Sequence, residues 1–240
     1  AVQLEVIQSI LSKLPLDNPL ALKFAGSFTA GRDVLKALKN TKEAGLTPGQ
    51  LRAIINANLE YIDVIEPSMI SMLEQPLRAK NLDNLVEQID RLPDQGISAE
   101  LEPLQDLGIV IKDSLRTAIA KDEGTAKTKF TGKWKQRWLQ NVDGQKGMHA
   151  ERERNKWWLE LSGVYELYRD ELHRRGYYDY SDMIVEVIKQ VQTNASLRAD
   201  IQEQYQYVLI DEFQDTNLVQ YLFIKLITEE HKNLLVVGDD

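Results

Sequence analysis

The chain has 240 residues, of which 43% are hydrophobic, and its 29 basic and 37 acidic residues give a formal net charge of −8. This is enough apolar chain for one large or two small folded domains. The sequence contains no cysteine and only three scattered histidines, which excludes a disulfide framework and argues against a zinc site. It also has no run of about 18 apolar residues and no secretion signal at its start. We therefore expect a cytoplasmic protein without a membrane partner.

Apolar residues at helix-face spacing occupy most of the first two hundred positions. Breaks fall at Pro15, at Gly45 ahead of Thr47 and Pro48, and at Gly176. The predicted helices cover residues 2–14, 31–62 (interrupted at Gly45), 68–91, 98–120, 152–175 and 183–191. Their mixed charge and apolar periodicity predict a helical bundle around one core.

A basic stretch from Gly124 to Val142 holds no acidic residue. Its cations are Lys127, Lys129, Lys133, Lys135 and Arg137, and its rings are Phe130, Trp134 and Trp138. On a helix the rings share one face, where they either stack on bases of nucleic acid beside phosphate-binding cations or form part of the core. The cations are either phosphate contacts or solvated. The glycines of this region leave open whether it is ordered or a mobile loop.

The last 34 residues predict a strand, a helix and a strand, over residues 207–210, 218–228 and 234–237. Val208, Leu209 and Ile210 suit a strand that is buried on both faces. Parallel pairing would bring the residues that follow the two strands to one edge of a sheet. These residues are Asp211 and Glu212 after the first strand and Gly238, Asp239 and Asp240 after the second. Asp211 suits Mg²⁺ binding and Glu212 suits activation of a water molecule. The alternative is a solvated turn in which Asp215 or Thr216 caps the following helix.

Three segments resemble one family. VLIDEFQDTNLVQ followed by LLVVGDD resembles motif II and the start of motif III of UvrD/Rep-type superfamily I DNA helicases. Residues 31–62 resemble the opening of the helical insertion called domain 1B. Residues 178–184 resemble the Asp-Phe-x-Asp-Leu box beside the single-stranded DNA path, with Tyr180 in place of phenylalanine.

The resemblance implies a mainly α fold in two parts. Residues 1–200 would form a domain 1B-like helical bundle with flanking helices, and residues 201–240 a partial RecA-like βαβ unit of a P-loop NTPase motor core. It implies that Asp211 coordinates Mg²⁺ and that Glu212 activates the attacking water. Gln214, Asp215 and Asp239 would lie at the nucleotide site. The implied cofactors are ATP and Mg²⁺, the implied partners are single-stranded and duplex DNA, and DNA repair is the expected setting.

The sequence contains no Gly-x-x-x-x-Gly-Lys-Ser/Thr phosphate loop, whose backbone amides and lysine cradle phosphates. We therefore expect an internal fragment of a helicase that cannot hydrolyse ATP alone and that pairs with the missing remainder of the same chain. Without further strands, residues 205–240 would expose apolar faces and strand edges. They are expected to be the least native part and to favour self-association.

Two other classes of protein stay open from the sequence. One is a non-catalytic DNA-binding scaffold in which the carboxylates are vestigial. The other is a helical interaction module whose acidic C-terminal segment is coincidental. ATP hydrolysis by the complete protein would exclude the DNA-binding scaffold. Further helicase motifs in the complete protein would exclude the helical interaction module.

Overall fold

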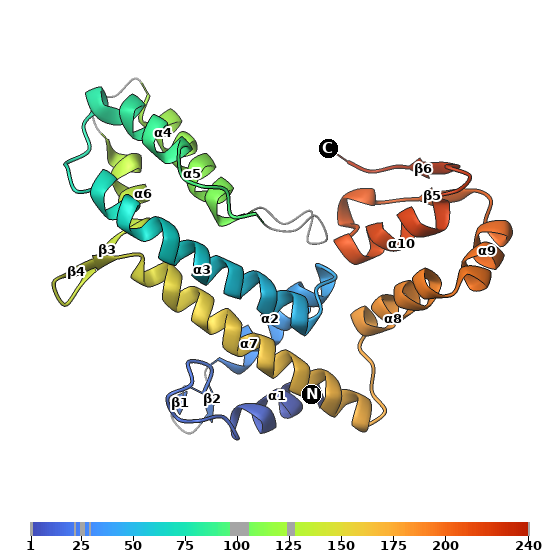
Figure 1. The fold of residues 1–240 in the computed structure, drawn as a ribbon. Coiled ribbons are helices and arrows are strands. Elements are labelled where there is room, and N and C mark those ends of the chain that lie inside the picture. Colours follow the sequence, from blue (N-terminus) through green and yellow to red (C-terminus); the bar gives the residue numbers. More distant parts are fainter. Residues whose placement is uncertain are drawn as a thin grey trace. The chain divides into compact units, whose positions relative to one another are not determined.

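The computed structural model describes residues 2–21, 30–96, 106–123 and 128–239, together with the backbone of β1 (Lys23–Phe24) and β2 (Ser27–Phe28). This part of the chain is mainly α-helical, as predicted, and its strands pair in two-stranded sheets (Figure 1). None of the helices described is long and apolar enough to cross a membrane. The chain divides into two compact units. We call residues 49–160 the middle unit and residues 1–48 with 161–240 the terminal unit.

The middle unit is a helical bundle with one hairpin. Its elements are α3 (Pro48–Met72), η1 (Ala79–Asn81), α4 (Leu82–Asp90), α5 (Leu107–Asp122), α6 (Lys129–Trp138), β3 (Gln140–Val142), β4 (Gln145–Gly147) and the first part of α7 (His149–Arg174). One core cluster joins α3, α4, α5 and α6, and its fully buried members include Ile62, Met69, Ile111, Trp138 and Met148. The packing of these helices is thus centred on one core.

The prediction of one helix over residues 68–91 is wrong. α3 instead runs through Pro67 to Met72, and α4 begins only at Leu82. The buried residues Ile65, Met69 and Leu73 recur every four positions, so core packing continues across the proline. The break falls where Pro76 disfavours a helical conformation in the residue before it.

The basic stretch is ordered where the structure describes it. Residues 129–138 form α6, and β3 and β4 follow as an antiparallel hairpin. Asp143 and Gly144 at its tip both have positive φ, 50° and 82°, which is typical of the type I′ turn that joins such strands. Lys127 lies outside the described residues.

The terminal unit contains both ends of the sequence. Its elements are α1 (Val2–Leu11), β1, β2, α2 (Gly31–Glu43), the second part of α7, α8 (Tyr180–Thr193), α9 (Ala195–Gln204), β5 (Val208–Ile210), η3 (Phe213–Asp215), α10 (Leu218–Thr228) and β6 (Leu234–Val236). α10 packs against α8 and α9 and buries Val219, Ile224 and Ile227. α2 lies against α1 and α8. The helices thus hold α10 firmly, and α10 links the two strands.

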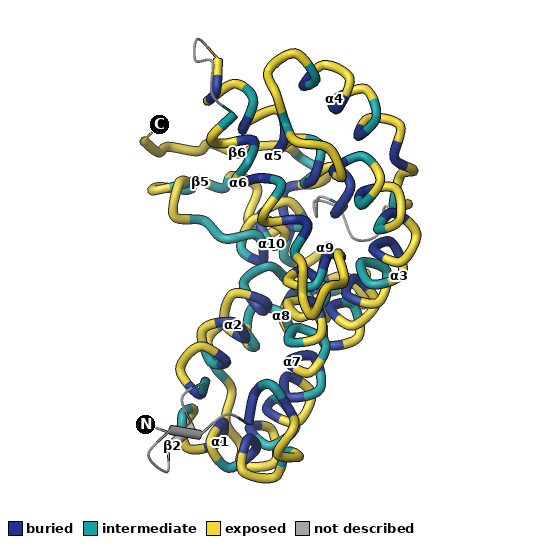
Figure 2. The backbone as a smooth tube through the Cα atoms, turned by 90° about the vertical axis from the view of Figure 1, so that its left-hand side faces the viewer, coloured by how far each residue is buried: buried dark blue, intermediate teal, exposed yellow. Residues whose placement is uncertain are grey.

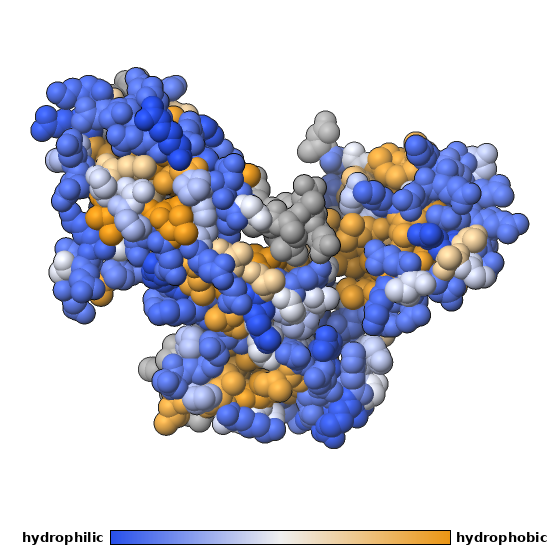
Figure 3. Space-filling model, viewed as in Figure 1, coloured by the Kyte–Doolittle hydropathy of each residue, from blue (hydrophilic) through white to orange (hydrophobic). Residues whose placement is uncertain are grey.

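β5 and β6 pair in parallel, with Val208 opposite Leu234 and Ile210 opposite Val236, so the predicted β–α–β arrangement is confirmed. The expectation that the first strand is buried on both faces is not met, because Leu209 is 72% exposed and Leu235 is 57% exposed. Figure 2 shows β6 as exposed along its length, and Figure 3 shows hydrophobic residues at the surface of this region. Among the described residues, no further strand pairs with either of them. The domain boundary predicted at residue 200 stays a prediction.

Candidate functional site

The carboxyl end of β5 carries Asp211 and Glu212. Asp211 Oδ1 accepts a hydrogen bond from the Glu212 backbone N–H at 3.0 Å. Glu212 has φ 53° and ψ 44°, in the left-handed region that costs a non-glycine residue about 1–2 kcal/mol. This turn directs the chain from the strand into η3. Strained backbone of this kind is concentrated at functional sites.

Gln214 links Glu212 to the end of the neighbouring strand. Its Nε2 donates a hydrogen bond to Glu212 Oε2 at 2.5 Å, and its Oε1 accepts one from the Asp239 backbone N–H at 3.0 Å. The backbone supports the same connection, because the Phe213 N–H donates to the Val237 carbonyl at 2.9 Å. The residues that follow β5 and β6 therefore meet at one edge, as predicted. Asp240 was predicted to lie there too, but it is outside the described residues.

Gly238 is required for this contact. A Cβ atom on Gly238 would lie 2.5 Å from Gln214 Oε1 and 3.2 Å from the Phe213 backbone nitrogen. The first distance is shorter than real Cβ contacts, and the second is a tight contact that a shift of a few tenths of an ångström would relieve. Any other residue at this position would therefore displace Gln214 or the strand.

A surface pocket of about 340 Å³ opens beside these carboxylates. It is lined by Ile210, Asp211, Glu212, Asp215, Thr216, Gln220 and Ile224. The N-terminus of α10 adjoins the pocket. Asn217 caps this helix, accepting from the Gln220 N–H at 2.9 Å while the Gln220 side chain accepts from the Asn217 N–H. Asp215 and Thr216, which the alternative of a solvated turn offered as caps, do not cap this helix, and both residues line the pocket instead.

The donors at this edge fit a magnesium ion of the nucleotide-bound kind. Among the described residues, no group of three or more His, Cys, Asp or Glu side chains could hold a metal by itself. Mg²⁺ in nucleotide sites needs only one or two carboxylates, because water and phosphate oxygens complete its octahedron. Asp211 and Asp215 both line the pocket and supply carboxylates of that type.

The cations of α6 form an exposed row in the middle unit. Lys129, Lys133 and Arg137 recur every four residues, and all three are exposed. Lys135 points elsewhere, with its Nζ donating to the Gln75 carbonyl at 3.3 Å. Burial, and then the nearby charge of Lys146, lower the pKa of Lys135. We call Lys129, Lys133 and Arg137 the α6 cation row.

The rings of α6 belong mainly to the core. Trp134 is 4% exposed and donates from Nε1 to Ser114 Oγ at 3.0 Å, and Trp138 is fully buried. This placement matches the core alternative left open by the sequence, because neither indole has an accessible face. Phe130 is the partly exposed ring, with Lys129 Nζ 5.7 Å from its centre.

A buried carboxylate fixes the start of α6. Asp122 accepts hydrogen bonds from the Phe130 and Thr131 backbone N–H groups and from Thr131 Oγ1, at 2.7–3.0 Å. Burial acts to raise the pKa of Asp122, but these hydrogen bonds outweigh it and hold the pKa below its usual value. The position of the α6 cation row thus depends on an ionised Asp122.

Tyr180 begins α8 in the terminal unit and is 73% exposed. Asp179 caps the helix, and its Oδ1 accepts from the Asp182 N–H at 2.9 Å. Lys42, which is 1% exposed, donates to Asp179 at 2.6 Å and to Asp182 at 2.8 Å. A buried cation therefore holds the helix end from which Tyr180 projects.

The two carboxylates around Lys42 differ in pKa. Burial acts to raise both values. The hydrogen bonds and charge of Lys42 lower the pKa of Asp179 below its usual value, whereas burial and the charge of Asp179 leave that of Asp182 raised. Burial also raises the pKa values of Tyr165 and Tyr168, whose rings lie 5.9 and 4.9 Å from Lys42 Nζ.

A pocket of about 580 Å³ beside Tyr180 includes cations that the sequence reading missed. Arg32, Lys36 and Lys39 of α2 line it together with Tyr180 and Ser181. Their spacing of four and three residues places them on one helix face. That spacing is visible in the sequence, but its link to Tyr180 comes from folding, because about 140 residues separate the two segments.

Comparison with known proteins identifies the family. The sequence pattern of the UvrD/REP helicase N-terminal domain matches residues 28–240. The chain belongs to this family. The segments aligned with curated UvrD/REP-type relatives are short. Identity is 42% over 72 residues with a probable DNA helicase of Mycoplasma pneumoniae, 32% over 77 residues with DNA helicase II of Haemophilus influenzae and 39% over 79 residues with ATP-dependent DNA helicase PcrA of Leuconostoc citreum.

These alignments cover 30–33% of this UvrD/REP-family chain and 10–14% of the relatives' own lengths. The chain thus spans a small part of the relatives it matches. No solved structure matches it significantly. Family membership therefore rests on the sequence pattern.

Proposed function

We propose that this chain is part of an ATP-dependent DNA helicase, which couples ATP hydrolysis to movement along single-stranded DNA and to unwinding of a duplex. The observation that carries the proposal is the contact of Gln214 with both Glu212 and the Asp239 backbone. It joins the proposed catalytic carboxylate to the end of the neighbouring parallel strand. Open α/β sheets bind their ligands at that edge.

In this proposal Asp211 binds the magnesium ion of Mg²⁺–ATP, with Asp215 beside it in the same pocket. The bound ion would neutralise charge on the transferred phosphoryl group. Glu212 orients a water molecule and accepts its proton. Gln214 restrains the Glu212 carboxylate, and Asp239 contributes to the same edge through its backbone.

The phosphates need a further binding element. Since these 240 residues contain no phosphate-loop motif, we infer that the amides and lysine of such a loop come from outside this sequence. The chain alone is then expected not to hydrolyse ATP. The exposed apolar faces of β5 and β6 are the surface on which we propose that further strands of the core, or a second copy, pack.

DNA binding is assigned to two surfaces. The α6 cation row suits phosphate contacts, and Lys135 adds a further cation on another face of α6. Tyr180, with Arg32 and Lys36 in the same pocket, suits one stacked base and its phosphate. Trp134 is left out of this proposal because its ring is buried.

The test is DNA-stimulated ATP hydrolysis by the complete protein, comparing wild type with Glu212→Gln. This change keeps the size of the side chain and removes the proposed base, so we expect at least a roughly 100-fold loss of turnover. The matched control is Glu229→Gln, an exposed residue after α10, which should hydrolyse ATP at the wild-type rate.

Two results would contradict the proposal. Full activity in the Glu212→Gln protein would remove Glu212 from the chemistry. Absence of hydrolysis in folded wild type that still binds DNA would favour the non-catalytic DNA-binding scaffold. The exposed α6 cation row is the feature that such a scaffold would use.

A further inference from the structure

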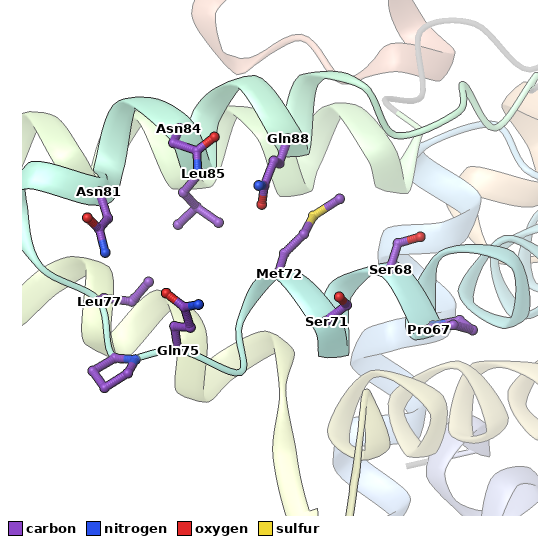
Figure 4. A pocket seen from close by; sticks show the side chains of 11 residues that line it. Pro67, Ser68, Ser71, Met72, Gln75, Leu77, Asn81, Asn84, Leu85 and Gln88 are labelled. Carbon is purple, nitrogen blue, oxygen red and sulfur yellow. The ribbon is translucent and has the colours of Figure 1, made fainter.

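A pocket of about 500 Å³ in the middle unit is not used by the proposed function. It lies between the end of α3, the segment that follows it, and α4 (Figure 4). Six neutral polar side chains line it: Ser68, Ser71, Gln75, Asn81, Asn84 and Gln88. Gln75 and Gln88 point into the gap from opposite sides (Figure 4).

These polar groups are available to a ligand. No charged side chain lines the pocket. Within the described part of the chain, none of the six polar side chains forms a hydrogen bond with another protein group. Together they present amide donors, amide acceptors and hydroxyl groups. The pocket therefore suits a neutral ligand that carries both donors and acceptors.

The remaining lining favours a flat ring. Met72, Leu77 and Leu85 supply apolar contact between the polar groups. A nucleobase has two apolar faces and a polar edge, and asparagine and glutamine can pair with such an edge through two hydrogen bonds. Proteins that read single strands commonly take unpaired bases in this way. The volume lies within the usual range for small-ligand pockets.

α6 brings positive charge to the rim. Lys135 Nζ donates to the Gln75 carbonyl at 3.3 Å, and Thr128 Oγ1 donates to the Leu77 carbonyl at 3.3 Å. Two residues of the lining are thus bonded to Lys135 and Thr128, on the side of α6 away from the α6 cation row. A neutral peptide would gain little from the Lys135 cation, whereas a nucleotide would place its phosphate against it.

We propose that this pocket takes one unpaired base of a single-stranded nucleic acid whose phosphate lies against Lys135. The inference rests on the proposed DNA binding by α6 and adds a site that contacts the base. It assigns Asn84 and Gln88 of α4 to the base edge and the apolar side chains to the ring faces. Backbone and base contacts would then come from adjoining elements of one unit.

The test compares two labelled single-stranded oligonucleotides of equal length in fluorescence anisotropy titrations with the 240-residue chain. One has all its bases, and the other has consecutive abasic sites at its centre. We expect the wild type to bind the first about tenfold more tightly, the size of one good base contact. Asn84→Leu/Gln88→Met keeps side-chain size and should lower this ratio severalfold, to what the proposed stacking on Tyr180 alone supplies, without changing the salt dependence. The control Asn56→Leu/Gln136→Met alters exposed amides outside the pocket and should keep the ratio.

An equal affinity ratio in wild type and in Asn84→Leu/Gln88→Met would overturn the inference. This is also the result expected if the pocket binds a peptide instead of a base. If both oligonucleotides bind equally well with a strong salt dependence, only the base site is lost and the proposed phosphate contacts stand. If neither oligonucleotide binds, the proposed DNA binding fails as well.

A second measurement is independent of any variant: adenosine 5′-monophosphate should shift the side-chain amide NMR signals of Asn84 and Gln88. Unshifted signals at saturating nucleotide would also refute the site.

Discussion

Lys42 Nζ lies 2.6 Å from Asp179 Oδ2, although the two residues are 137 positions apart in the sequence. The lysine is buried on α2, and the aspartate caps α8. With Asp182 at 2.8 Å, two carboxylates share one buried cation. This contact ties the segment before the middle unit to the segment after it.

Lys42→Met should destabilise the terminal unit by about 3 kcal/mol, because loss of the buried cation leaves two half-buried carboxylates without a counter-charge. The free energy of unfolding is measured by urea titration followed by circular dichroism. Lys39→Met is the control, since its ion pair with Glu43 is exposed and should contribute less than about 0.5 kcal/mol. Equal losses of unfolding free energy in the two variants would show that the Lys42 cluster stabilises the fold no more than an exposed ion pair.

Gly238→Ala should release Gln214 from Asp239, because the added Cβ would lie 2.5 Å from Gln214 Oε1. The side-chain amide NMR signals of Gln214 should move, and ATP turnover by the complete protein should fall about tenfold, the factor for about 1.4 kcal/mol of lost restraint. Gly163→Ala on α7, where nothing lies within 4 Å of the new Cβ, should keep both readouts unchanged. Unmoved Gln214 signals in Gly238→Ala would contradict the steric argument.

Lys129→Ala/Lys133→Ala/Arg137→Ala should weaken binding to single-stranded DNA and flatten the slope of log affinity against log salt by about 0.7 for each lost phosphate contact. The measurement is a series of anisotropy titrations between low and moderate salt. Lys13→Ala/Arg91→Ala/Lys121→Ala removes three exposed cations outside α6 and is the control for net charge. An unchanged slope in the α6 variant would mean that these cations are merely solvated.

Asp122 should make the middle unit sensitive to acid. Its folded-state pKa is lowered from 3.8, so its stabilising effect is complete above the pKa of the unfolded state and is lost as the pH falls through the folded-state pKa. Asp122→Asn should therefore lower Tm at pH 7, and the difference from wild type should shrink as the pH falls below about 4. Asp113→Asn, which removes an exposed ion pair with Arg116, should show little difference at either pH. A constant difference across this range would be evidence against the ionised cap.

Local signals in the sequence predicted a large part of this fold. The Asp-Glu pair after an apolar run, the Gly45–Pro48 break and the β–α–β order were all readable, because each depends on neighbouring residues. The α3 boundary was not, since core contacts of Met69 and Leu73 carry the helix past Pro67. Nor was the cap of α10, where Asn217 and Gln220 satisfy each other.

The long-range parts of the candidate site were beyond sequence reasoning. The contact of Lys42 with Asp179 and the grouping of Arg32 with Tyr180 depend on segments that meet only after folding. The sequence also left open whether Trp134 packs in the core or stacks on a base. Helical spacing shows which residues share a helix face, but it does not show whether protein or solvent covers that face. The hydrogen bond to Ser114 now accounts for its ring orientation.

The left-handed backbone of Glu212 has a consequence for how sequences of this kind can vary. Glycine adopts φ 53° without steric cost, so Glu212→Gly would relieve strain of about 1 kcal/mol. It would also delete the proposed catalytic carboxylate. Selection for thermostability alone would drift toward glycine at this position, whereas selection for turnover would retain the acid. An engineering search that scores only melting temperature would therefore remove the proposed catalytic carboxylate while appearing to improve the protein.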